Sequence, residues 1–241
     1  MLLILSSNKL RLNIMEIHPL SLVNTTKYDN ICNDYDHLDK ESENKIHCNI
    51  RKEVCQGLFG NIIEIGVGTG NNIPYYPNNI KSYTGVDVSI KMLEFIKNKY
   101  NFKLSTKTTQ FQFPISLRQG DIGLLKGEKD NSYNWYIATY VFCVLPQEII
   151  KMGITQMIRV LKNAGRFKIV DIVISKNKEI RRQQIQDSQK LKNLYSLNLY
   201  NNTLGIIQNI KFKNTQIKIK LTTIKYLYND TFLLIEGIIF K

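Results

Sequence analysis

Several features that would assign a protein to a particular class are missing from this sequence. No run of 18 apolar residues occurs, so nothing in the chain predicts a transmembrane helix. The four cysteines form no C-x-x-C pair, and no histidine lies at metal-ligand spacing from them. This argues against a disulfide framework and against zinc, so we expect no metal. Free thiols fit a reducing compartment inside the cell, either cytoplasmic or mitochondrial.

Acidic residues are absent from the N-terminal region before Glu16, and the first five residues are all apolar. With Lys9 and Arg11, this composition resembles a weak organelle-targeting or membrane-surface segment. It is equally typical of a leader without a defined signal, in which Met15 is a second possible translation start. We expect residues 1–26 to form a poorly structured leader.

Acidic residues are also scarce overall, and the formal net charge is +13. Residues 175–241 hold 12 basic and 4 acidic side chains, and such a region can contact nucleic acid or an anionic membrane surface. However, Lys and Asn are abundant along the whole chain, as expected from an AT-rich genome. No RNA-binding aromatic motif accompanies the charge. Nucleic acid is therefore a less favoured partner than a small molecule or a lipid.

The sequence does contain a glycine-rich turn after a short apolar run. Residues 62–70 read Ile-Ile-Glu-Ile-Gly-Val-Gly-Thr-Gly, which indicates a buried strand and a loop that a ligand can approach closely. Asp87 lies 21 residues after Gly66, at the end of a second apolar run. A carboxylate at about this distance, roughly 20 residues, is placed to bind the two hydroxyls of a ribose. The pair predicts a nucleoside-containing cofactor, and the alternative is an ordinary turn with Asp87 as a helix cap.

Glu64 helps to choose between cofactors, because it stands two residues before the first glycine of the loop. A carboxylate there would repel the pyrophosphate of NAD but would complement a sulfonium and an amino group. The pattern therefore favours S-adenosylmethionine over NAD.

The rest of the chain alternates between predicted strands and helices. This predicts an α/β fold with a Rossmann-like, seven-stranded, mostly parallel sheet and helices on both faces. Ligands bind such sheets at the carboxyl ends of the strands, where Glu64, Gly66, Asp87, Asp121 and Thr139 fall. We expect strands near 61–65, 82–87, 115–119, 134–138, 166–174, 216–226 and 231–240. We expect helices at 27–58, 89–100, 146–161 and 178–195. A further helix should follow the glycine loop, with interruptions at Pro74 and Pro77. Residues 101–114 should form a loop.

Four further segments carry recognisable motifs in a consistent order. They are Tyr28-Asp29-Asn30-Ile31 with Tyr35-Asp36, Gly85-Val86-Asp87-Val88-Ser89, Asp130-Asn131-Ser132-Tyr133-Asn134, and Arg159-Val160-Leu161-Lys162-Asn163-Ala164-Gly165. With the glycine loop, they make residues 28–174 resemble class I S-adenosylmethionine-dependent methyltransferases of the ubiquinone and menaquinone biosynthesis group. Two shorter matches, at 72–77 and 141–145, resemble the related phosphatidylethanolamine and thiol methyltransferases. Asn163 and Ala164 replace the usual Pro-Gly, and we expect them to alter only the turn.

The resemblance implies S-adenosylmethionine as the cofactor and one methyltransferase domain over residues 27–241. Within it, residues 27–58 would be helical, 59–174 would bind the cofactor, and 175–241 would lie on the acceptor side. The resemblance also implies which residues contact each part of the cofactor. Gly66, Gly68 and Gly70 would approach the methionine part and ribose, Glu64 would order their loop and complement the positive charge, and Asp87 would bind the ribose. Val88 and Met92 would pack on the adenine, and Asp121 and Ile122 would meet the amino group of the adenine. Ala138 and Thr139 would present backbone carbonyls to the methionine amino group. Tyr28 and Tyr35 would form a lid over the cofactor. Met92, Asp121 and the two tyrosines also fit ordinary roles in the core or as a helix cap.

No catalytic base is apparent in the sequence. The absence of Pro-Pro and Pro-Cys argues against the motifs of DNA adenine and cytosine C5 methyltransferases. Apolar neighbours predict that Cys143 is a buried, inert thiol. His37 and His47 belong to the helical segment and could reach an acceptor, although a surface position is more typical. A thiol or phenol that ionises near neutral pH would need little base.

We therefore predict an S-adenosylmethionine-dependent methyltransferase that acts on a small or lipophilic acceptor, such as a quinone precursor, a thiol or a lipid amine. One alternative is a methyltransferase of RNA or protein. Another is a cofactor-binding protein that has lost catalysis.

Overall fold

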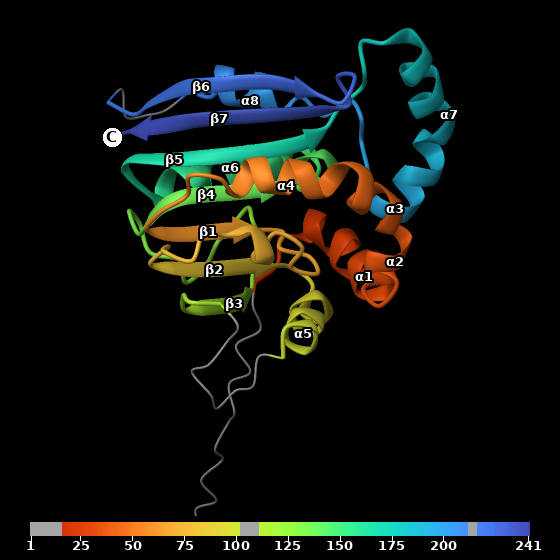
Figure 1. The fold of residues 1–241 in the computed structure, drawn as a ribbon. Helices are drawn as coiled ribbons and strands as arrows, with labels where there is room; N and C mark the ends of the chain where they lie inside the picture. The colour runs from red at the N-terminus through yellow and green to blue at the C-terminus, as the bar shows by residue number, and fades with distance from the viewer. Residues whose placement is uncertain (1–15, 102–110, 212–215) are drawn as a thin grey trace, which may run out of the picture.

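A seven-stranded sheet forms the centre of the computed structural model, which describes residues 16–101, 111–211 and 216–241 (Figure 1). The strand order is β3-β2-β1-β4-β5-β7-β6. Strands β1 to β5 pair in parallel, whereas β7 is antiparallel to both of its neighbours. The predicted mostly parallel, Rossmann-like sheet is confirmed. The strands are β1 (Asn61–Ile65), β2 (Ser82–Asp87), β3 (Ile115–Gln119), β4 (Tyr133–Thr139), β5 (Leu161–Ile172), β6 (Lys218–Leu227) and β7 (Phe232–Phe240).

Helices cover both faces of this sheet, because each amphipathic helix buries its apolar side against it. In Figure 1, α4 lies in front of the sheet, and α6 and α8 lie behind it. Ile50 of α4 and Ile96 of α5 join one core cluster with β1 and β2. Ile154 of α6 and Ile207 of α8 join the other. The larger helices are α1 (Leu22–Ile31), α4 (Cys48–Cys55), α5 (Ile90–Lys99), α6 (Gln147–Val160), α7 (Lys178–Tyr195) and α8 (Thr203–Asn209).

A second group of helices lies beyond the carboxyl ends of the parallel strands, on the right in Figure 1. It contains α1, α7 and the short helices α2 (Tyr35–Leu38) and α3 (Lys40–Ser42). A π-helical turn (Glu43–His47) joins α3 to α4. The predicted helical segment at 27–58 is therefore several helices, and its first part covers the end of the sheet where ligands bind.

The N-terminal part of the chain differs from the expected leader. Residues 1–15, with Lys9, Arg11 and Met15, lie outside the described residues. From Pro19 the chain forms a 3-10 turn and then α1, so regular structure begins before the expected boundary at residue 26. Asn24 is buried in α1 and donates to the Val144 carbonyl. This tertiary contact orders a helix whose own sequence is only weakly amphipathic.

Three other expectations about elements need correction. The expected helix after the glycine loop is only a 3-10 turn (Ile73–Tyr75), which contains Pro74 near its start and is followed by Pro77, a residue without an N–H to continue it. Strand β5 starts at Leu161, directly after α6, and includes Ala164 at a φ of 59°. Helix α8 was not predicted, because its seven residues carry a short and weak pattern. The loop expected at 101–114 falls mostly on 102–110, outside the described residues.

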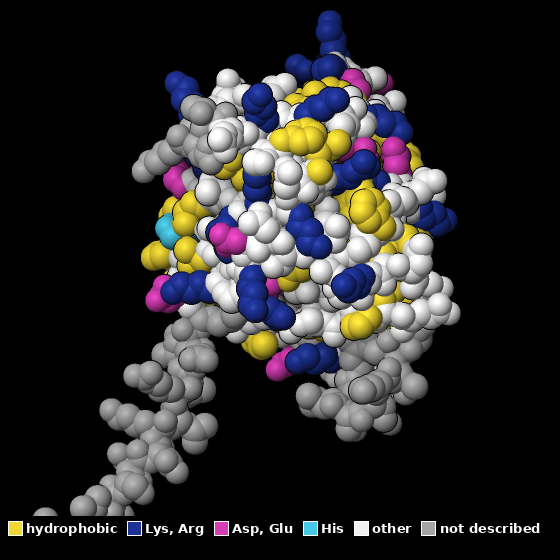
Figure 2. Space-filling view, turned by 90° about the vertical axis from the view of Figure 1, so that its left-hand side faces the viewer, with side chains coloured by type: hydrophobic (Ala, Val, Ile, Leu, Met, Phe, Trp, Pro, Cys, Tyr) yellow, Lys and Arg dark blue, Asp and Glu magenta, His cyan; other side chains and the backbone are white. Residues whose placement is uncertain are grey.

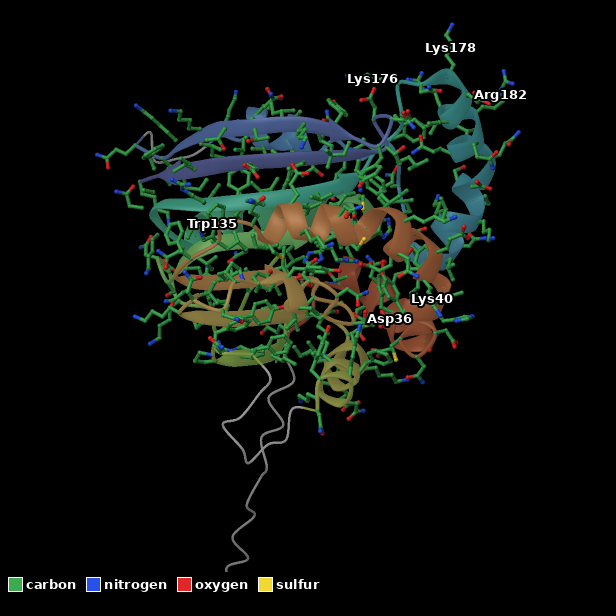
Figure 3. All side chains as sticks on the ribbon, viewed as in Figure 1. Asp36, Lys40, Trp135, Lys176, Lys178 and Arg182 are labelled. Atoms are coloured by element: carbon green, nitrogen blue, oxygen red, sulfur yellow. The ribbon has the colours of Figure 1, made fainter. Side chains whose placement is uncertain are left out.

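Within the described ranges, no helix is both long enough and apolar enough to cross a membrane. Basic side chains occur singly among polar and apolar ones over the face in Figure 2. Lys178 and Arg182 of α7 point away from the fold in Figure 3.

Candidate active site

The glycine loop leaves β1 with three glycines in the left-handed region. Their φ angles are 59° at Gly66, 54° at Gly68 and 78° at Gly70, which side chains other than glycine rarely adopt. A Cβ on Gly66 would lie 2.5 Å from a methyl of Val141, whereas one on Gly68 would meet nothing within 4 Å. The loop is thus closed against the protein at Gly66 and open at Gly68, where a ligand can approach the backbone.

Asp87 stands at the end of β2, beside this loop. Its carboxylate accepts the Gly68 N–H at 2.8 Å and the Ser89 N–H at 2.9 Å. Burial raises the pKa of Asp87 to about 6, although the two backbone N–H groups oppose this shift. An ionised carboxylate offers roughly four acceptor positions, so about two remain for a ligand such as a ribose.

Glu64 is buried behind the loop rather than beside the open space. Its oxygens accept hydrogen bonds from Asn72 at 2.8 Å, Tyr76 at 2.9 Å and Tyr83 at 2.7 Å. Burial raises the pKa of Glu64, and the hydrogen bonds of the two tyrosines oppose this. Asn72 also donates to Thr139 Oγ1 at 2.9 Å. Glu64 therefore connects the residues after the loop to the end of β4.

A cavity of about 90 Å³ lies between the glycine loop, the ends of β2 and β4, and helix α1. Tyr28 and Tyr35 form part of its wall, with their ring centroids 6.2 Å apart. Seven residues predicted to bind the cofactor line it, namely Gly66, Gly68, Asp87, Val88, Met92, Ile122 and Thr139.

The other three predicted residues lie outside this cavity wall. Glu64 faces the buried network described above, and Gly70 accepts the Tyr100 hydroxyl through its carbonyl. Both carboxylate oxygens of Asp121 are engaged by backbone N–H groups, one from His18 and one from Gly123. Asp121 thus caps the turn at Gly123 and fastens the N-terminal segment.

Residues 18–39, which we call the strap, cover the cavity and are fastened to its rim. Asp36 accepts hydrogen bonds from Thr69 at 2.6 Å, Asn71 at 3.1 Å and Lys99 at 2.7 Å. Asp29 accepts the hydroxyl of Ser89. Each aspartate follows one of the two cavity tyrosines, so the repeated Tyr-Asp pair combines a wall residue with an anchor. The repeated Tyr-Asp pair could be recognised in the sequence, but the hydrogen-bond partners of Asp29 and Asp36 could not.

A second cavity, of about 240 Å³, adjoins the first. Tyr28, Tyr35, Tyr140 and Val144 line both cavities. Its remaining walls come from α7, the segment after it, the end of β5, β7 and the region from Asp39 to His47, and they combine aromatic and aliphatic side chains with polar ones such as Asp39, Ser42 and Gln184. These residues come from distant parts of the chain, and apart from His47 and Cys143 the sequence did not single them out.

Cys143 lies at the edge of this second cavity and is fully buried. Burial and the neighbouring Asp171 raise the pKa of the Cys143 thiol well above its ordinary value. A neutral, buried thiol is a poor nucleophile, which agrees with the predicted inert role.

Comparison with known proteins supports this description. The family model described as "Methyltransferase domain" matches residues 62–165. Among curated proteins, none matches this chain by sequence. A solved S-adenosylmethionine-dependent methyltransferase from Thermotoga maritima, described as a possible histamine N-methyltransferase, has a TM-score of 0.59 at 16% identity. The match covers 89% of this chain and 98% of that one.

Two other solved structures share the fold with lower TM-scores. A geranyl diphosphate methyltransferase in complex with GPP and sinefungin has a TM-score of 0.57 at 10% identity, covering 80% of this chain and 76% of that one. The [4+2]-cyclase SpnF has a TM-score of 0.53 at 16% identity, covering 68% and 65%. At these identities the likeness concerns the fold alone, and the fold also supports other chemistry. Residues 62–165 thus match a methyltransferase domain, and the described residues have the fold of the S-adenosylmethionine-dependent methyltransferase from Thermotoga maritima.

Proposed function

We propose that the protein transfers a methyl group from S-adenosylmethionine to a small, lipophilic acceptor. The observation that carries this proposal is the pair of adjoining cavities with a shared wall of three tyrosines and one valine. The first cavity has the glycine loop and Asp87, and the second has mostly aromatic and aliphatic walls. Two reactants held in adjoining cavities are placed for in-line displacement, and the covering helices exclude water.

The cofactor contacts follow from the first cavity. Gly66 and Gly68 would approach the ribose and methionine part, and Asp87 would accept the ribose hydroxyls. Val88 and Met92 would pack on the adenine. Glu64 and Gly70 would act by shaping the loop. The backbone carbonyls of Ala138 and Thr139 would face the amino group, and Asp121 would support the adenine end beside Ile122.

The strap would move when the cofactor binds. The first cavity holds about 90 Å³, below the roughly 300–1,000 Å³ typical of ligand pockets. The strap is fastened to the rim by the side-chain hydrogen bonds of Asp29 and Asp36. We expect it to open for cofactor exchange and to close for catalysis.

The second cavity favours a small acceptor over RNA or protein. A macromolecular substrate needs an open, charged approach, whereas this cavity lies beneath the strap and α7. The basic side chains of α7 labelled in Figure 3 point away from it. Its size and lining fit an acceptor of the quinone-precursor kind better than a charged lipid head group.

Isothermal titration with S-adenosylmethionine and S-adenosylhomocysteine tests the proposal. We expect micromolar binding to the wild type and a loss of at least tenfold in Asp87→Ala, since hydrogen bonds to a charged group contribute about 1.5–3 kcal/mol. Glu148→Ala, on the exposed side of α6, should bind like the wild type.

The pH dependence of the same titration gives a sharper result. The ionised form of Asp87 offers more acceptor positions, and its pKa is about 6. Binding should therefore weaken as pH falls from 7 to 5, and this dependence should vanish in Asp87→Asn. Folded wild type that binds neither ligand would rule out the proposed function. Binding without methyl transfer to any small acceptor would instead favour an inactive cofactor-binding protein.

A further inference from the structure

His47 occupies an unusual place in the wall of the second cavity. It ends the π-helical turn Glu43–His47, in which the Cys48 N–H reaches back to the Glu43 carbonyl. Such turns are rare and occur frequently at functional sites. The His47 side chain is buried, and its ring packs against Tyr140 at 4.8 Å and edge-on against Phe232 at 5.5 Å. A buried histidine in a cavity wall is placed to exchange a proton with a molecule bound in that cavity.

Asp39 orients this histidine. Its Oδ2 lies 3.0 Å from His47 Nδ1, so a neutral ring donates from Nδ1 and keeps a lone pair on Nε2. Within the described part of the chain, no hydrogen bond reaches Nε2. Both residues line the second cavity. This is the arrangement of a general base and its orienting carboxylate.

The other charged groups near His47 are already paired. Glu43 lies 3.9 Å from His47 Nδ1, but both of its oxygens accept the Arg51 Nε–H at 3.0 Å. Arg51 also lies 5.5 Å from the Tyr140 ring. Thus Asp39 is the carboxylate that accepts the hydrogen bond of His47. The remaining titratable groups of the cavity are Tyr28, Tyr35, Tyr140, Tyr195 and Cys143.

A metal ion is a poorer explanation of this cluster. Ligand atoms of Asp39, Glu43 and His47 do lie within 4.8 Å of one another. However, the Arg51 guanidinium contacts both Glu43 oxygens and would repel a cation bound there.

Tyr140 adds an independent observation. It follows β4 with a φ of 62°, a strained backbone for a tyrosine. Its hydroxyl is buried and has no hydrogen-bond partner among the described residues. Its ring forms part of both cavities. A buried hydroxyl without a partner calls for an explanation, and Tyr140 belongs to the wall shared by the two cavities.

We propose that His47, held by Asp39, is the general base for an aromatic hydroxyl acceptor bound in the second cavity. This proposal rests on the proposed function and names its acceptor class. A phenol fits the aromatic walls, and its hydroxyl needs a base more than a thiol does, because a thiol ionises more readily. Tyr140 would donate to the same oxygen.

The reaction balances without another reactant. The acceptor O–H bond breaks as the His47 Nε2–H bond forms. The acceptor oxygen then forms a bond to the methyl carbon, and the carbon–sulfur bond breaks with its electron pair going to sulfur. Asp39 stabilises the resulting imidazolium, which releases its proton to solvent once the products leave.

The first test needs no turnover. Protein saturated with S-adenosylhomocysteine is titrated with 4-nitrophenol, whose ionised and neutral forms differ in visible absorption. The wild type should bind it and ionise it at a pH lower than that in water. His47→Gln should bind it in the neutral form over the same pH range. Wild-type protein that binds 4-nitrophenol without this shift, or does not bind it, overturns the proposal.

The second test is methyl transfer to phenols by variants that still bind S-adenosylhomocysteine. His47→Gln should lower kcat by about 10²–10⁴-fold, the usual contribution of a general base. Asp39→Asn should lower kcat less and change its pH profile. Lys52→Gln is the control, because Lys52 is exposed on α4 and lines neither cavity, and it should behave like the wild type.

These outcomes separate the two proposals. Loss of cofactor binding in the wild type would overturn the proposed function. Normal cofactor binding with phenol methylation that is unchanged in His47→Gln would overturn only the role of His47. Transfer to thiols or amines in place of phenols would overturn the acceptor class.

Discussion

Individual residues in the glycine loop have different tasks although their backbones are alike. Gly66 must be small because Val141 lies against it, whereas Gly68 faces open space. Both have a positive φ, so each substitution carries backbone strain. The two positions therefore separate a requirement of the fold from a requirement of ligand binding.

We expect Gly66→Ala to lower the free energy of unfolding by roughly 2–4 kcal/mol, from backbone strain and the clash with Val141. Gly68→Ala should cost about 1–2 kcal/mol from strain alone but weaken S-adenosylhomocysteine binding more than tenfold. Urea denaturation and isothermal titration measure the two effects.

Gly127→Ala is the control, since Gly127 has a φ of 86° and a Cβ added there would meet nothing within 4 Å. It should lose stability like Gly68→Ala and bind the ligand like the wild type. Equal binding by Gly68→Ala and Gly127→Ala would contradict an open ligand position at Gly68.

The strap is the element whose role depends most on polar anchors. Burial works against ionisation of Asp36, but hydrogen bonds from Lys99 and Thr69 lower its pKa below the ordinary value. Asp36 stays ionised at neutral pH and joins α2 to the glycine loop and α5 (Figure 3). Weakening this anchor should loosen the strap without removing a core residue.

Asp36→Ala should therefore raise the dissociation rate of S-adenosylhomocysteine by roughly tenfold, as measured by stopped-flow displacement. Global stability should change by less than about 1 kcal/mol, because the Lys99 pair is partly exposed. Lys45→Ala removes an exposed ion pair with Glu41 in the neighbouring α3 region and should leave the rate unchanged. An unaltered rate in Asp36→Ala would show that this anchor does not control release.

At the scale of the whole molecule, the buried carboxylates Asp87 and Asp171 at the carboxyl end of the sheet affect stability. Burial raises the pKa values of Asp87 and Asp171 from 3.8 to about 6. The native state thus binds more protons than the unfolded chain between about pH 4 and 6. Their contribution to stability is complete below pH 4 and is lost as pH rises through 6.

Asp171→Asn should accordingly reduce the fall in the free energy of unfolding between pH 5 and 7.5. Over this range the reduction is at most roughly 1.5 kcal/mol, because about half of the shift of the Asp171 pKa has already acted below pH 5 and each unit corresponds to about 1.4 kcal/mol. Urea denaturation across this range measures it. Asp130→Asn, an exposed residue paired with Arg159, should leave the pH dependence as it is. A wild-type slope in Asp171→Asn would contradict the raised pKa.

Much of this protein follows from local sequence rules. The strands from residue 61 to residue 139, the bounds of α5 and the full extent of α7 agree with their predictions. These features depend on apolar periodicity, on capping and on glycine or proline, each of which acts over a few neighbouring residues. The glycine loop and Asp87 follow from the same rules, because adjacent parallel strands bring their ends together.

The strap anchors and the second cavity depended on tertiary structure. Asp29 and Asp36 could be read as surface residues until the fold brought Ser89 and Lys99 beside them. His47 lay in a helical segment with no sign that it was buried, because its neighbours Tyr140 and Phe232 come from distant strands. No local pattern records such contacts, since they form only when the sheet and its covering helices assemble.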